Sequence, residues 1–153
     1  MTDNKDKTTL NPTTLNIITP KKAFQRKVKN LGKTERNKIK QFIALFQQGG
    51  FQAIDNHFIG GYKVRNKSSG NVHKDDPQFI AKVKYAQKYK LWHFHAGFYD
   101  LDCDIEGYKL SEQGDLTSQW VIHYQKHSDH HISVVTLGSH PPMILPQEND
   151  IVQ

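Results

Sequence analysis

The sequence predicts a single α+β domain with helices in the first half of the chain and antiparallel strands in the last third. Before residue 50, apolar side chains recur at helical spacing within Lys-rich segments, and a third such segment follows Asp76-Pro77. After residue 90, three stretches are rich in aromatic and β-branched residues and end in Gly, Asp, Ser or Pro. A chain of 153 residues is the size of one domain. We therefore expect N-terminal helices packed on one face of a small antiparallel sheet.

Polar tails are expected at both ends of the chain. Residues 1–14 are mostly Thr, Asn, Asp and Lys, a composition that buries too little apolar surface to offset the entropy lost on ordering. We expect the domain to cover residues 15–146, beginning with a short strand at 15–18. Residues 147–153 are then a C-terminal tail.

An αα-hairpin is expected after the first strand. Thr19 followed by Pro20 is typical of a helix N-cap and first helical position, and Gly32 supplies a stop. Thr34 caps a second helix that ends at the glycine pair 49–50. Because the connection is short, the two helices form a hairpin whose apolar stripe must pack on another element.

The second half of the chain predicts one more helix and three strands. Residues 51–75 show no clear period, with a short strand within 56–65 and a loop composition at 66–71. The Asp76-Pro77 pair then opens a third helix, with Lys82, Lys84 and Lys88 expected in solvent. The strands are expected at residues 90–96, 118–126 and 131–137, the last two as a hairpin with its turn at 127–130.

Charge and composition narrow the function classes. The formal net charge is +6, and Lys and Arg concentrate in residues 21–40 and 82–90, which favours a polyanionic partner. The single Cys103 excludes an internal disulfide framework and any zinc cluster built on cysteines. No apolar run approaches the ~18 residues of a membrane span, and the N-terminus lacks the apolar core of a signal peptide. We expect a cytoplasmic protein that does not enter a membrane.

Histidines in the predicted strands are the main candidates for chemistry. Alternation places His93 and His95 on one face, about 7 Å apart, and His123 on the face opposite Tyr124. His140 follows the third strand, before two prolines. Imidazole titrates near neutrality, so these groups suit proton transfer during RNA cleavage without a metal, with Lys90 or Lys126 holding the phosphate.

The same residues allow other interpretations. His93 and His95 could ligate a metal together with a third ligand from His123, His127, His130, His131 or Asp129, which would make the protein a metal-dependent hydrolase or oxygenase. The histidines could equally be structural, in a non-catalytic nucleic-acid-binding module. Tyr124 fits a core-facing set with Trp120 and Ile122, which leaves Val121, His123 and Gln125 facing outward. The Lys-rich helix faces could simply be solvated.

Three motifs together resemble a known family. They are His93-Phe-His95-Ala, Leu116-Thr-Ser-Gln-Trp-Val-Ile-His-Tyr124-Gln and Asp129-His-His-Ile-Ser-Val-Val-Thr-Leu-Gly-Ser-His-Pro-Pro142. In this order they are similar to the core of the YafO toxins, which belong to the RelE-like superfamily of toxin–antitoxin mRNA interferases. The resemblance covers roughly residues 80–146, and the order of a strand and an αα-hairpin in the front half is also similar to RelE-like folds.

The resemblance implies a RelE-like fold and a ribosome-dependent endoribonuclease that cuts mRNA in the decoding site, needs no cofactor and is neutralised by a cognate antitoxin. By position, His93, His95, Thr117 and Tyr124 match the family pattern as catalytic residues. His140 corresponds only approximately, because the order of proline and histidine differs here. In such a toxin the basic helix would contact RNA phosphates, and Lys22 and Arg26 are candidates for these contacts.

Overall fold

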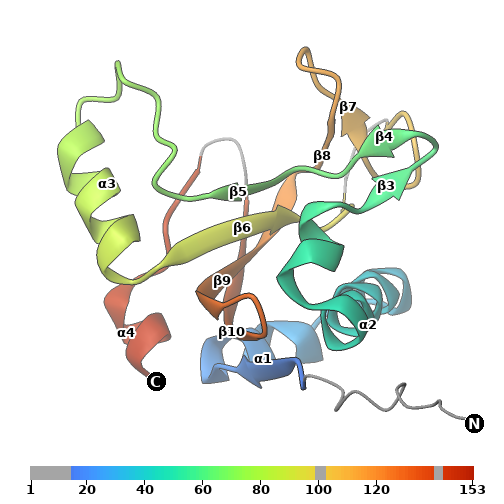
Figure 1. Ribbon diagram of the computed structural model, residues 1–153, viewed down its shortest axis with the longest axis horizontal. Coiled ribbons are helices and arrows are strands. Elements are labelled where there is room, and N and C mark those ends of the chain that lie inside the picture. The colour runs from blue at the N-terminus through green and yellow to red at the C-terminus, as the bar shows by residue number, and fades with distance from the viewer. Residues whose placement is uncertain (1–14, 99–102, 140–142) are drawn as a thin grey trace, which may run out of the picture.

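A five-stranded mixed sheet forms the centre of the computed structural model, which describes residues 15–98, 103–139 and 143–153 (Figure 1). In spatial order the strands are β2 (Ile17–Pro20), β10 (His131–Ser139), β9 (Trp120–Ser128), β6 (Leu91–His95) and β5 (Asn66–Ser68). Strand β2 pairs in parallel with β10, and all other neighbours in this sheet pair antiparallel. The predicted α+β class is confirmed. The expected tail over residues 1–14 lies outside the described residues.

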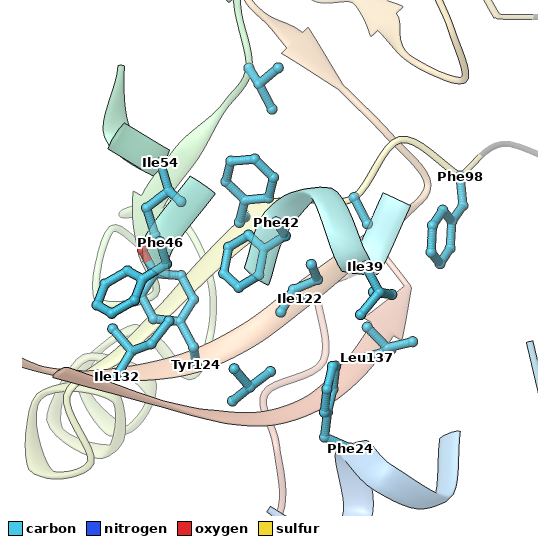
Figure 2. Packing of buried hydrophobic residues seen from close by; sticks show 14 of the residues in the cluster. Phe24, Ile39, Phe42, Phe46, Ile54, Phe98, Ile122, Tyr124, Ile132 and Leu137 are labelled. Atoms are coloured by element: carbon cyan, nitrogen blue, oxygen red, sulfur yellow. The ribbon is translucent and has the colours of Figure 1, made fainter. Parts of the chain in front are cut away.

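The αα-hairpin consists of α1 (Lys22–Lys29) and α2 (Lys33–Asp55), and it covers one face of the sheet. Figure 2 shows Phe42 and Phe46 of α2 packed against side chains of the central strands. In this cluster Phe42 lies beside Phe94, with ring centroids 4.9 Å apart, and beside Tyr124 at 6.0 Å. These aromatic contacts make the face nearest the hairpin the main hydrophobic core.

One helix start differs from the prediction. Thr19 and Pro20 belong to β2 rather than to a helix, because the parallel pairing with β10 extends to Pro20 and the Lys21 N–H donates to the Val134 carbonyl (2.8 Å). The predicted helix end at residues 49–50 is confirmed, because Gly50 has non-helical backbone angles (φ 69°, ψ −156°) and divides α2 into two helical segments, the second of which reaches Asp55. A Cβ at Gly50 would lie 2.6 Å from the Asp129 carbonyl oxygen, so only glycine fits beside the β9–β10 turn in this conformation.

The opposite face of the sheet is also covered. Helices α3 (Phe79–Lys88) and α4 (Glu148–Val152) contribute Ala86 and Ile151 to a second cluster with Leu91 and Val135. The expectation of helices on one face only is therefore wrong. Residues 147–153 are not a tail, since Ile151 is buried. None of the helices in the described part of the chain is long and apolar enough to cross a membrane.

Two segments between the main elements contain more strand than their composition suggests. The hairpin of β3 (Phe58–Ile59) and β4 (Tyr62–Lys63) follows α2, and the hairpin of β7 (Lys109–Leu110) and β8 (Leu116–Thr117) lies between β6 and β9. Residues 66–71, predicted as a loop, contain β5, which pairs Lys67 with His93 of β6. Sequence propensity misses β5 because this pairing, and a hydrogen bond from the Tyr124 hydroxyl to Asn66 Oδ1 (2.7 Å), stabilise it through tertiary contacts.

Candidate functional site

Three imidazoles gather on the sheet face opposite the αα-hairpin. His93 and His95 alternate with Trp92 and Phe94 along β6, and His123 lies directly across from His93 on β9. The ring centroid of His93 is 5.8 Å from that of His95 and 6.4 Å from that of His123. We call His93, His95 and His123 the histidine cluster. Its members share one face, as strand alternation predicts.

The histidine cluster is buried. The exposed fractions of His93, His95 and His123 are 6%, 1% and 0%. The sequence-based expectation of an outward-facing His123 is wrong, because α3, α4 and the segment 143–146 lie over this face.

His95 is held by the backbone at Ser118. The Ser118 N–H donates to His95 Nδ1 (2.8 Å), and the Ser118 carbonyl oxygen lies 3.0 Å from the same nitrogen. Since an amide N–H can only donate, the neutral ring with its proton on Nε2 satisfies the shorter contact. Protonation of Nδ1 would place two N–H groups against each other. His95 is therefore suited to a fixed tautomer rather than to proton exchange through Nδ1.

His93 has a more permissive partner. Its Nδ1 lies 3.1 Å from the Ser69 hydroxyl, which follows directly after β5. A hydroxyl can donate to a neutral ring nitrogen and accept from a protonated one, so this contact tolerates both protonation states. The Ser69 backbone N–H donates to the Leu91 carbonyl (2.8 Å), which fixes the hydroxyl beside the ring. Of the two histidines on β6, His93 is the one whose surroundings allow proton transfer.

His93 also reaches a basic cavity. A cavity of about 410 Å³ opens between β5, α3 and the segment after β10, with three permanently cationic side chains and one carboxylate among its lining residues. The lining residues are Arg65, Lys67, Ser69, Asn71, Val72, His73, Asp76, Lys82, His93, Met143 and Leu145. We call this space the basic cavity. Its charge balance suits an anionic group such as a phosphate.

Ion pairs hold two of the cations in place. Arg65 makes a two-pronged contact with Asp115, from Nε to Oδ2 (2.7 Å) and from Nη2 to Oδ1 (2.8 Å). Burial favours the neutral form of Asp115, but hydrogen bonds from Arg65 and Ser111 outweigh it and lower the pKa of this carboxyl. Lys82 Nζ donates to Asp76 Oδ2 (2.7 Å), which lowers the pKa of Asp76. The cationic groups are thus oriented before any ligand arrives.

Two residues matched to the family pattern lie away from the histidine cluster. Tyr124 is on the hairpin face of the sheet, fully buried, and burial raises the pKa of its hydroxyl well above the ordinary value. Thr117 is in β8, where its hydroxyl donates to the Lys109 carbonyl (3.2 Å). The structure therefore does not bring Tyr124 to His93, and it gives Tyr124 a core role through its bond to Asn66. His140 lies outside the described residues.

The predicted phosphate-binding cations are dispersed. Lys126 Nζ lies 3.7 Å from the Phe51 ring centroid, on the hairpin face, and 3.2 Å from Asp129 Oδ1. Lys90 precedes β6 in a left-handed conformation (φ 56°), at the end of the sheet near His127. Lys22 and Arg26 are exposed on α1. None of these four lines the basic cavity.

Sequence reasoning missed Lys67 and placed Lys82 in solvent. Lys67 sits in a segment with loop composition, and only its pairing opposite His93 reveals that it borders the site. Lys82 lies six residues after Asp76, so the nearby carboxylate is a sequence signal for the bond between these two side chains.

The alternative metal ligands lie at the far end of the β9–β10 hairpin. His127 Nε2 lies 2.8 Å from the Ser133 hydroxyl, and His130 Nδ1 lies 2.8 Å from Asn16 Oδ1. Over residues 15–98, 103–139 and 143–153, no group of three or more His, Cys, Asp or Glu side chains is arranged to hold a metal ion. The described residues thus supply no ligand set for the metal-dependent interpretation.

Comparisons with protein-family models, with curated proteins and with solved structures find no match to this chain.

Proposed function

We propose that this protein is a toxin-type endoribonuclease with a RelE-like fold, which blocks translation by cutting ribosome-bound mRNA without a metal and is neutralised by an antitoxin. The observation that carries this proposal is His93 at the wall of a cavity that also presents Lys67 and Lys82. An imidazole beside oriented cations supplies two of the contributions that metal-free phosphodiester cleavage uses, proton transfer and stabilisation of negative charge on the phosphate oxygens. The order of strand, αα-hairpin and antiparallel strands β6, β9 and β10 supports the RelE-like assignment.

His93 is the proton-transfer residue in this proposal. As a base, His93 would take the proton of the RNA 2′-OH. The 2′-oxygen then attacks the neighbouring phosphorus and expels the 5′-oxygen of the next nucleotide. The products are a 2′,3′-cyclic phosphate and a free 5′-OH. The Ser69 hydroxyl would donate to the neutral His93 ring and accept from the protonated one. His95 and His123, whose rings lie next to that of His93, would act as positioning residues.

The cations would stabilise the negative charge that builds up on the phosphate oxygens. Lys67, directly opposite His93 in the strand pairing, and Lys82 from α3 approach from two walls of the basic cavity. Arg65 would contribute as a fixed positive group, because Asp115 holds its guanidinium. The acid that protonates the leaving 5′-oxygen is assigned to no described residue, and the sequence-based prediction for His140 stays a prediction.

Cleavage of mRNA in a reconstituted translation reaction tests the proposal. The wild-type protein should cut mRNA on the ribosome and leave ends with 2′,3′-cyclic phosphate and 5′-OH, whereas a metal-activated water leaves no cyclic phosphate. His93→Gln should lower the rate by about 10²-fold or more. The matched control is His130→Gln at the far end of the β9–β10 hairpin, which should cut normally. A protein that binds ribosomes with no cleavage would instead be a non-catalytic binding module.

A further inference from the structure

Two further cavities share lining residues with the spaces beside them. A second cavity, of about 340 Å³, shares Leu145 with the basic cavity and is also lined by His123. A third, of about 510 Å³, shares Lys27, Trp120 and Leu137 with the second. Neighbouring cavities in this series, which runs from His93 to the turn between α1 and α2, therefore have walls in common.

Trp120 is the aromatic group at the centre of this path. It is the first residue of β9, so its side chain stands at the end of the sheet and lines both the second and the third cavity. The third cavity continues to Phe98, which Figure 2 shows on the same side of the core as Leu137. A half-buried indole beside an open space is a stacking surface for a planar ring.

Lys27 provides a cation at the same place. Its ammonium group donates to the Leu137 carbonyl (2.9 Å), which fixes it at the rim that the two cavities share. Aromatic side chains combined with cations along a path are how proteins bind single-stranded nucleic acid without reading its sequence.

We infer that Trp120 and Lys27 form a subsite for a nucleotide of single-stranded RNA, next to the phosphate that the basic cavity binds. This inference rests on the proposed function for the identity of its ligand. The nucleobase stacks on Trp120, Lys27 contacts the backbone of that nucleotide, and the chain continues past Leu145 to His93. Such a contact increases affinity for any base, because every base presents a flat face.

Fluorescence of Trp120 gives a direct test. The chain has two tryptophans, so Trp92→Phe leaves Trp120 as the only one, and Trp92 lines none of the three cavities. The probe is a trinucleotide of 2′-O-methyladenosine, which lacks the 2′-OH needed for cleavage. It should quench Trp120 in a saturable way, whereas inorganic phosphate should bind without quenching. No quenching by the trinucleotide would overturn the inference.

Variants identify the groups that bind the probe, with affinity measured by the anisotropy of a labelled trinucleotide. Trp120→Leu should weaken binding by about tenfold or more, and Trp120→Phe should retain most of it. Lys27→Met should also weaken binding, while Lys40→Met, an exposed lysine of α2 outside these cavities, should not. If Trp120→Leu does not fold, Lys27→Met decides, and unchanged affinity in that variant overturns the inference.

The two proposals can fail separately. Cleavage of ribosomal mRNA together with no quenching of Trp120 would overturn only the nucleotide subsite. Saturable quenching together with no cleavage would retain the subsite and overturn the nuclease.

Discussion

Adjacent residues of the same strands lie on opposite faces of the sheet, and the two faces have different surroundings. On the hairpin face, Phe94 and Tyr124 join a continuous aromatic core with α2. On the other face, the neighbouring His93 and His123 are buried beside cavities and polar groups. Burying imidazoles contributes less to stability than burying hydrocarbon, since each polar atom must find a partner. The hairpin face therefore contributes more to stability, and the face with the histidine cluster is the one to which we assign the proposed chemistry.

The largest effect on folding is expected from the hairpin face. Phe42→Ala removes a ring that is 1% exposed and packs on both Phe94 and Tyr124. The free energy of unfolding should fall by about 3–5 kcal/mol, because a cavity replaces the ring. Urea denaturation followed by circular dichroism measures this. A loss below 1 kcal/mol would show that this face is not the main core.

The cations of the basic cavity and the cations on α1 should contribute unequally to RNA binding. The double variant Lys67→Gln with Lys82→Gln removes cations from the basic cavity, so ribosome affinity should fall and its salt dependence should flatten by about 0.7 per lost phosphate contact. Lys22→Gln with Arg26→Gln, on exposed α1, removes the same charge outside that cavity. Its effect should be smaller, and equal effects of the two double variants would place RNA on both surfaces.

A smaller change is expected for Tyr124→Phe. The variant keeps the ring but removes the hydroxyl that donates to the buried Asn66 Oδ1, which should lower the free energy of unfolding by about 1–3 kcal/mol. Cleavage by the folded fraction should continue, because the hydroxyl lies on the face opposite His93. Comparison of urea midpoints with cleavage rates checks both parts.

The smallest effect concerns pH and His127. Partial burial, the neighbouring His131, and the cations Lys90 and Lys21 lower the pKa of His127 below its ordinary value. The unfolded chain therefore binds a proton at His127 more readily than the folded protein does. The contribution of neutral His127 to the free energy of unfolding is fully present above pH ~6.5 and is lost as the pH falls through the lowered pKa. Urea midpoints between pH 7.5 and pH 5 should decline less in His127→Gln than in the wild type. Identical declines would assign the acid sensitivity to other groups.

Alternation of residues along β6 and β9 was enough to predict which side chains share a face. His93 with His95, and Tyr124 with Ile122, follow from the period of a strand alone. The α+β class and the αα-hairpin also follow from periodicity. What the sequence could not provide were contacts between distant segments. Strand β5 forms because β6 is beside it, and α4 forms a stable element because Ile151 meets Val135.

The candidate site shows the same limit. The histidines have a recognisable pattern, but the basic cavity depends on Lys67, Ser69 and Lys82, which come from a segment without periodicity and from the exposed side of a predicted helix. Lys126 is the opposite case. Its position in the predicted strand beside His123 made it a candidate for phosphate binding, but its ammonium group lies over the Phe51 ring on the hairpin face. Which cations meet a histidine is decided by tertiary packing rather than by sequence separation.

We propose that the face with the histidine cluster carries the chemistry and that the hairpin face contributes most of the stability. One paired measurement tests it most directly, namely the cleavage rate and the urea midpoint of His93→Gln beside those of Tyr124→Phe. We expect His93→Gln to lose about 10²-fold or more of the cleavage rate with a nearly unchanged midpoint, and Tyr124→Phe to show a lowered midpoint with cleavage retained. Retained cleavage in His93→Gln together with lost cleavage in a stably folded Tyr124→Phe would contradict the account.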